Sequence, residues 1–144
     1  MKDEYNLQRF VLAQDQVYAS VLDELRAGEK HGHWMWYIFP QMKGLGHSVM
    51  AQQYAITSLA ETKAYLEHAL LGSRLRECTG LVMNVEGRSA ERIFGYSDNL
   101  KLRSSMTLFN EASTENNIFQ DALLKYFEGK PDQSTLDILK CSRL

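Results

Sequence analysis

The sequence contains few of the residues that mark specialised classes of protein. Among its 144 residues are only two cysteines, Cys78 and Cys141, and two prolines, Pro40 and Pro131. Two widely separated cysteines cannot form a disulfide framework, so a small secreted scaffold is excluded. No Gly/Ser-rich stretch divides the chain, and its length suits one folding unit. We therefore expect a single helical domain over residues 1–144.

Long apolar runs and an excess of charge are also lacking. No run approaches the roughly 20 apolar residues of a membrane span, and the first residues, MKDEYNLQRF, lack the apolar stretch of a signal peptide. A net charge of −2 gives no basic field for nucleic acid or an anionic membrane. We expect a cytoplasmic protein that binds neither, with a monomer as the starting assumption.

The apolar pattern is helical nearly everywhere, and cap residues divide it into segments. We expect N-caps at Asp15, Ser48, Ser58, Ser89, Ser97 or Asp98, Asn117 and Ser134, with Ser58 and Glu61 forming an S-x-x-E capping box. Glycines are expected to end helices at Gly28, Gly87, Gly95 and Gly129, and to interrupt one at Gly72. No segment shows the period-2 alternation of a strand. The prediction is an all-α fold: a compact single-domain multihelical bundle of about seven to nine helices, several of them short, with no significant sheet.

The segment HGHWMWYIFPQMKGLG, residues 31–46, is unusually rich in aromatic residues. Trp34 and Trp36 are two positions apart, so on a helix they point about 200° away from each other. One interpretation is that these large side chains build the core. The other is that one aromatic face, with His33 and Gln41, lines a pocket for a planar or ribose-bearing ligand. The two are compatible, since one face can turn inward and the other toward a cleft.

Lys101, Ser104 and Ser105 form a second unusual group, at spacing i, i+3, i+4 on the expected helix NLKLRSSMTLFNEA. This spacing places them on a strip beside the apolar stripe, with Arg103, Thr107 and Asn110 expected on the solvent face. The three could hold a phosphate or carboxylate. Alternatively, the serines bond back to the i−4 carbonyls and the lysine extends to solvent.

Histidine and helix-start positions supply the remaining candidates. His33 is the candidate acid–base catalyst, because imidazole changes charge near neutral pH; a purely structural histidine is the alternative. His31 and His33 form an H-x-H pair without a carboxylate or cysteine at ligand spacing, so no metal site is expected. Ser48, following Gly44 and Gly46, could present helix N–H groups to an anion.

The motifs HWMWYIFPQMKGLGHS, YAITSL, LGSRLREC and IFGYSDNLKLRSSMTLF resemble the bacterial family called domain of unknown function eighteen-ten, whose members are often mislabelled "calpastatin". The resemblance runs from NLQRFVLAQ (6–14) to TLDIL (135–139). It implies a mainly helical cytoplasmic domain and no assigned activity. Two positions depart from the family pattern: Gly32 stands where Ser or Thr is usual, and Ala69 stands where Pro follows His68.

Two hypotheses remain open. The first is a small enzyme or pocket for a nucleotide- or ribose-type metabolite, without a bound cofactor. The positions expected to line it are Lys30, His33, Trp34, Trp36, Gln41, Ser48, Lys101, Ser104 and Ser105. It requires the tryptophan segment and the double-serine helix to meet around one hollow. The second is a non-catalytic helical module that binds a protein or a metabolite, with an exposed apolar patch or a pocket without convergent titratable groups.

Overall fold

The computed structural model describes residues 3–142. Apart from one isolated parallel bridge between Met42 and Ile56, all regular secondary structure in this range is helical, which confirms the all-α prediction. One more helix forms than the upper expected number, since the aromatic segment makes a one-turn helix of its own. The helices are α1 (Gln8–Asp15), α2 (Tyr18–Ala27), α3 (Met35–Ile38), α4 (Val49–Gln53), α5 (Leu59–Glu67), α6 (Ala69–Asn84), α7 (Ala90–Phe94), α8 (Asp98–Glu111), α9 (Ile118–Phe127) and α10 (Gln133–Ser142).

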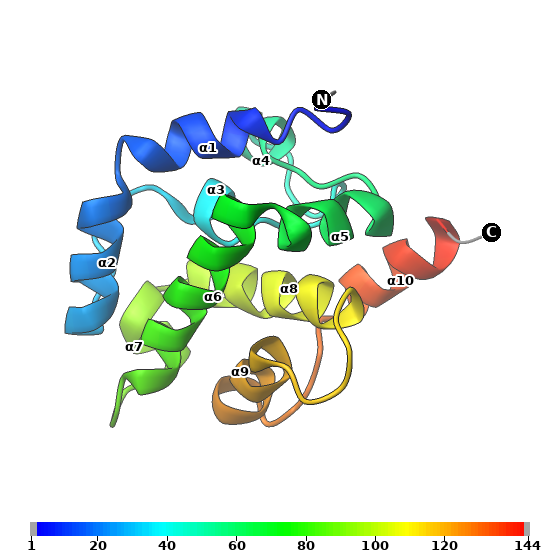
Figure 1. Ribbon diagram of the computed structural model, residues 1–144. Coiled ribbons are helices and arrows are strands. Elements are labelled where there is room, and N and C mark those ends of the chain that lie inside the picture. Colours follow the sequence, from blue (N-terminus) through cyan, green and yellow to red (C-terminus); the bar gives the residue numbers. More distant parts are fainter. Residues whose placement is uncertain (1–2, 143–144) are drawn as a thin grey trace.

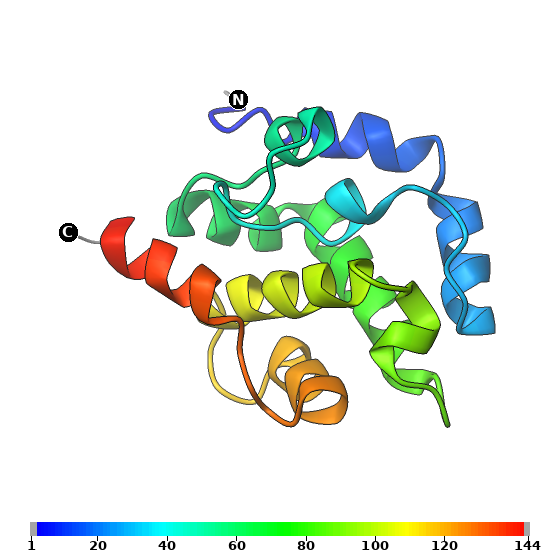
Figure 2. The same ribbon diagram turned by 180° about the vertical axis from the view of Figure 1, so that it is seen from behind.

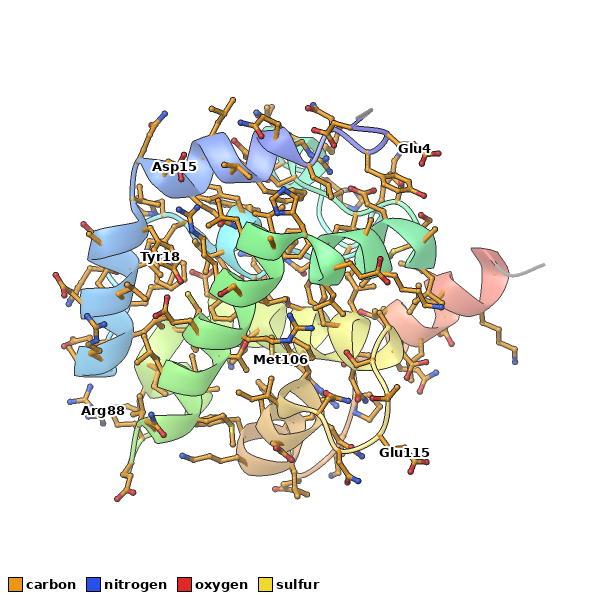
Figure 3. All side chains as sticks on the ribbon, viewed as in Figure 1. Glu4, Asp15, Tyr18, Arg88, Met106 and Glu115 are labelled. Carbon is orange, nitrogen blue, oxygen red and sulfur yellow. The ribbon has the colours of Figure 1, made fainter. Side chains whose placement is uncertain are left out.

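Helix α8 lies at the centre of the molecule. It packs against α5, α7, α9 and α10, while α6 crosses it and packs against α2, α5 and α9 (Figure 1). Met106 of α8 is fully buried and lies where α6, α8 and α9 meet (Figure 3). The buried apolar side chains form one cluster that draws on nearly every helix. No helix within residues 3–142 is both long and apolar enough to span a bilayer.

Most of the predicted helix starts are correct, because they depend on local chemistry. Four N-cap side chains accept a hydrogen bond from the backbone N–H three residues further on: Ser48, Ser58, Ser89 and Asn117. The capping box is only half formed: the Glu61 carboxylate accepts from Thr57 rather than from the N–H of Ser58. Each cap satisfies a first-turn donor that would otherwise lack a partner.

Some local predictions are wrong, and at three positions a tertiary contact decides the outcome. Gly72 lies inside α6 instead of interrupting it. Asp15 ends α1 and pairs with Arg74 (Nη2–Oδ1, 2.8 Å), whereas α2 begins after Val17 without a side-chain cap. Thr107 is buried instead of facing solvent, because the chain leading into α10 covers that side of α8.

The family departure at Ala69 concerns the start of α6. His68 caps this helix, its Nδ1 accepting from the backbone N–H groups of Leu70 and Leu71 at 3.2 Å each. Ala69 is the first helical residue, a position where proline is well tolerated. The departure is therefore a local change at a helix start.

Candidate ligand pocket

The tryptophan segment and the double-serine helix meet at one hollow. It lies between the α3–α4 connection, the first turns of α8 and the start of α10, which share the side of the molecule seen in Figure 2. The hollow has a volume of about 520 Å³, within the usual range for small-molecule sites. We call it the Trp36–Lys101 pocket. It is lined by Trp36, Gln41, Leu45, Gly46, His47, Ser48, Ala51, Ser97, Leu100, Lys101, Ser104, Asp132 and Ser134.

Trp36 forms the aromatic wall of this pocket. Its neighbours Met35, Tyr37 and Ile38 are buried, whereas Trp36 is only partly buried and lines the hollow. The two tryptophans point in nearly opposite directions, as their two-residue spacing predicts, so Trp34 enters the core and Trp36 faces the pocket. Phe39 is fully buried, and the backbone leaves the helix there, before Pro40.

Gln41 is positioned by the short bridge between two connecting segments. Its backbone carbonyl accepts from Ile56 N at 2.9 Å, and Ile56 O accepts from Lys43 N at 2.8 Å. The main chain is therefore fixed on both sides of Met42. In the described part of the chain the Gln41 side chain has no hydrogen-bond partner, so its amide can serve a ligand as donor or acceptor.

Lys101 brings a positive charge to the pocket. Its Nζ lies 5.7 Å from the centre of the Trp36 ring and 2.9 Å from Asp98 Oδ1. Asp98 Oδ2 lies 2.9 Å from the buried Nζ of Lys30, so one carboxylate connects two ammonium groups. Burial alone would raise the pKa of Asp98, but the hydrogen bonds and charges of Lys30 and Lys101 outweigh it and hold that pKa below its usual range.

Of the nine predicted positions, five line this pocket and four do not. Trp36, Gln41, Ser48, Lys101 and Ser104 lie together, whereas Lys30, His33, Trp34 and Ser105 lie outside. His33 is exposed and Trp34 is 2% exposed. Ser105 is fully buried and its Oγ has no hydrogen-bond partner among the described residues. Both lysines pair with Asp98, but Lys30 does so from outside the pocket, so of the two only Lys101 lines the hollow.

Ser48 lines the pocket, but its hydroxyl accepts from Ala51 N at 3.1 Å as the cap of α4. Helix α4 is only five residues long. The Ser48 hydroxyl is therefore engaged in the cap and shapes the wall of the pocket.

Several pocket residues were missed by the sequence reasoning. Asp132 could have been recognised as an N-cap, because an aspartate three residues before Thr135 can accept from its backbone N–H. The predicted start at Ser134 placed the cap too late. The sequence indicated Ser97 only as a possible helix start and gave no signal for His47, because the position of both at the pocket depends on how the α3–α4 connection and the start of α8 pack. The peptide bond between Tyr96 and Ser97 is cis.

The loop before Trp34 is held by a single carboxylate. Glu24 Oε1 accepts from His31 N (2.6 Å), Gly32 N (2.8 Å) and Trp34 Nε1 (3.1 Å). A Cβ on Gly32 would lie 2.7 Å from the Trp34 ring. The usual hydroxyl residue would therefore shift this loop, which lies outside the Trp36–Lys101 pocket.

Replacing Glu24 by glutamine is expected to destabilise the protein by about 1 kcal/mol at neutral pH, allowing for partial solvent screening. Burial would raise the pKa of Glu24, but the Gly32, His31 and Trp34 N–H groups hold it below its usual value. The carboxylate's contribution is thus present above the unfolded-state pKa and disappears as pH falls through the folded-state pKa. Urea unfolding from pH about 7 to about 3 should show the two proteins converging; a constant gap would contradict this, and the exposed Glu29→Gln is the control.

A hollow larger than the Trp36–Lys101 pocket lies elsewhere in the described residues. This α5–α9 groove has a volume of about 740 Å³ and contains none of the predicted site residues. Lys63, Glu67, Arg76 and Glu111 line it with exposed side chains of both signs. Among residues 3–142, no three His, Cys, Asp or Glu side chains are grouped so that they could hold a metal ion.

Comparison with known proteins places the chain in a family. The family model described as "Protein of unknown function (DUF1810)" matches residues 4–139. The crystal structure of the conserved hypothetical protein Rv1873 from Mycobacterium tuberculosis is 56% identical, with 96% of this chain and 99% of that chain covered, at a TM-score of 0.94. No curated protein matches. The chain therefore belongs to the DUF1810 family, as its motifs had indicated.

Proposed function

We propose that this protein binds a small planar metabolite with an anionic group, of nucleotide or ribose type, in the Trp36–Lys101 pocket. The observation that carries the proposal is the position of Lys101 Nζ, 5.7 Å from the centre of a partly exposed indole at the wall of one hollow. Aromatic rings stack on planar heterocycles. An anion oxygen bound to this ammonium would lie within about 9 Å of the ring centre, which suits a ligand whose ring and anion are a short distance apart.

Polar groups without protein partners support the same proposal. In residues 3–142, no hydrogen bond engages the side chains of Gln41, Ser97 and Ser134 or the indole N–H of Trp36. All four lie at the pocket wall. A few placed polar groups on a partly apolar wall are typical of small-molecule sites.

The geometry favours binding over catalysis. His33, the expected acid–base group, lies outside the pocket. His47 does line it, and is the imidazole that could exchange a proton with a ligand. The rival hypothesis, a protein-binding module, has weaker support, since the exposed large apolar side chains are spread over several elements: Leu12, Val49, Leu70, Tyr96, Leu100 and Leu124.

We also propose that the protein works in the cytoplasm as a monomer and binds neither nucleic acid nor membrane. The near-neutral charge of −2 agrees with this. So do the free thiols of Cys78 and Cys141, which suit a reducing compartment. Sedimentation of the purified protein would test the monomer.

A ligand panel tests the proposed function directly. Ribonucleoside 5′-monophosphates, ribose 5-phosphate and the free nucleosides would be screened by thermal shift, because a ligand that binds only the native state raises the melting temperature. Replacing Lys101 by methionine keeps the stem and removes the charge. It should weaken a phosphate-bearing ligand about ten- to a hundredfold and leave its nucleoside almost unchanged.

Lys63→Met, in the α5–α9 groove, is the matched control and should leave binding unchanged. No stabilisation by any member of the panel would refute the proposed function. Equal loss in the Lys101 and Lys63 variants would refute the part given to Lys101.

A further inference from the structure

Two side chains of the Trp36–Lys101 pocket can offer a ligand only a hydrogen-bond acceptor. They are Ser104, on α8, and Asp132, just before α10, and both line the hollow. What each can still offer to a ligand follows from the hydrogen bonds it already makes.

Ser104 has used its only donor. Its Oγ–H donates to the Leu100 carbonyl at 3.2 Å, and the residue is 7% exposed. A hydroxyl has one hydrogen and two lone pairs, so a ligand meets Ser104 as an acceptor. The ligand atom at this position must therefore carry a hydrogen.

Asp132 has used one of its two oxygens. Its Oδ2 accepts from Thr135 N (3.0 Å) and from Thr135 Oγ1 (2.6 Å), which caps α10. In the described residues no partner engages Oδ1. An ionised carboxylate can only accept hydrogen bonds, so a ligand atom bound to this oxygen must also be a donor.

Three hydrogen bonds hold the segment that carries Asp132 against α8, the helix that carries Ser104. Arg103 donates through Nε to Lys130 O (2.9 Å) and through Nη2 to Pro131 O (3.0 Å), and Asp132 N donates to Thr107 Oγ1 (2.8 Å). Arg103 and Thr107 lie one turn apart on α8, so the segment 130–132 crosses the helix along their face, and Ser104, three residues before Thr107, borders that face. Acceptors fixed in this way need little reordering when a ligand binds.

Resting on the proposed function, we propose that Ser104 and Asp132 bind the vicinal hydroxyls of a ribose, so that the ligand is a ribonucleotide and not a deoxyribonucleotide. Two acceptors that line the same pocket match the two hydroxyl donors of a ribose. The phosphate belongs at the other polar position, Lys101, because a second anion beside the Asp132 carboxylate would be repelled. Loss of one hydroxyl leaves a desolvated acceptor without a donor, which is the usual basis of selection for a polar group.

Calorimetric titration with each ribonucleoside 5′-monophosphate and its 2′-deoxy counterpart tests the inference. The deoxy form should bind the wild-type protein about ten- to a hundredfold more weakly. Asp132→Asn retains a cap, because asparagine is an equally good N-cap, but it can replace the free acceptor by an amide donor. Ser104→Ala removes the other acceptor without harm to helix propensity.

Both variants should lose most of the preference for ribose by weakening the ribonucleotide alone. Ser113→Ala is the matched control, because Ser113 also bonds back four residues, to Phe109 O at 2.8 Å, but lines the α5–α9 groove. Equal affinities for ribo and deoxy ligands would overturn the diol inference and leave the pocket standing. If neither form binds, the proposed function fails, and the diol inference with it.

Discussion

Replacing Glu61 by alanine should lower the free energy of unfolding by about 3 kcal/mol, as expected for a broken buried ion pair. Glu61 is 2% exposed, and its Oε2 lies 3.0 Å from Arg9 Nη2. Its Oε1 accepts from both the backbone and the hydroxyl of Thr57 at 2.9 Å. The substitution leaves the Arg9 charge largely buried without a counter-ion and leaves two donors of Thr57 unpaired.

The loss is large because Arg9 joins distant parts of the chain. Its guanidinium also donates to four backbone carbonyls, those of Tyr5, Asn6, Gln53 and Ala55. The pair thus connects α1 to the segment between α4 and α5, which also carries the Ile56 bridge beside Gln41. Urea unfolding followed by circular dichroism would measure the effect.

Glu67→Ala is the control for this substitution. Glu67 lies on the same helix with an exposed side chain, so its removal should change stability by less than about 0.5 kcal/mol. Similar losses in the two variants would show that the Arg9–Glu61 pair contributes little.

Alanine at Gly72 should destabilise the protein by about 1–3 kcal/mol, although alanine is the better helix former. A Cβ at this position would lie 2.1 Å from the Leu66 carbonyl oxygen. That carbonyl belongs to the end of α5, where the chain turns into α6, and Arg76 Nη1 donates to it at 3.3 Å. The turn must open before an alanine can fit.

A second glycine of α6, Gly80, provides a control for which the expected change in stability has the opposite sign. At Gly80 the nearest atom to an added Cβ is Ile118 Cδ1 at 3.9 Å, an ordinary contact. Gly80→Ala should therefore stabilise the protein by about 0.5–1 kcal/mol. Thermal unfolding of both variants would measure the difference, and a gain in stability at Gly72 would contradict the close approach of α5 and α6.

The sequence predicted best those parts of the fold that depend on near neighbours. Ser48, Ser58, Ser89 and Asn117 cap helices because a side chain and an N–H three residues away suffice. Gly72 was misread because glycine gives the same signal for a helix end and for a close helix contact. Only the fold decides between them.

Thr107 shows the same limit at the pocket. Its spacing on α8 suggested the solvent face, but the segment before α10 crosses the helix there and buries it. No local sequence pattern indicates that this segment crosses α8. Asp132 could therefore be recognised as a helix cap but not as a residue of the pocket. The sequence could identify Trp36 as an unusual aromatic position and Lys101 as an unusual polar one. That the two lie at one pocket was a hypothesis about the fold.

His33 and Ser105 were misplaced for a different reason. Both lie in the two segments that form the pocket, but a shift of one position on a helix or turn points a side chain in another direction. His33 is exposed and Ser105 is fully buried. Proximity in sequence therefore identified the two correct segments but not every correct residue.

The central claim, that the Trp36–Lys101 pocket binds a ligand, is tested most directly by the indole N–H signals in a ¹⁵N NMR titration with ribonucleoside 5′-monophosphates. The chain has two tryptophans: the indole of Trp34 is buried and bonded to Glu24, whereas Trp36 lines the hollow. The account predicts that the Trp36 signal shifts with ligand concentration while the Trp34 signal stays in place. The claim would be contradicted if neither indole signal moved. It would also be contradicted if the only signals to shift were backbone amides of the α5–α9 groove.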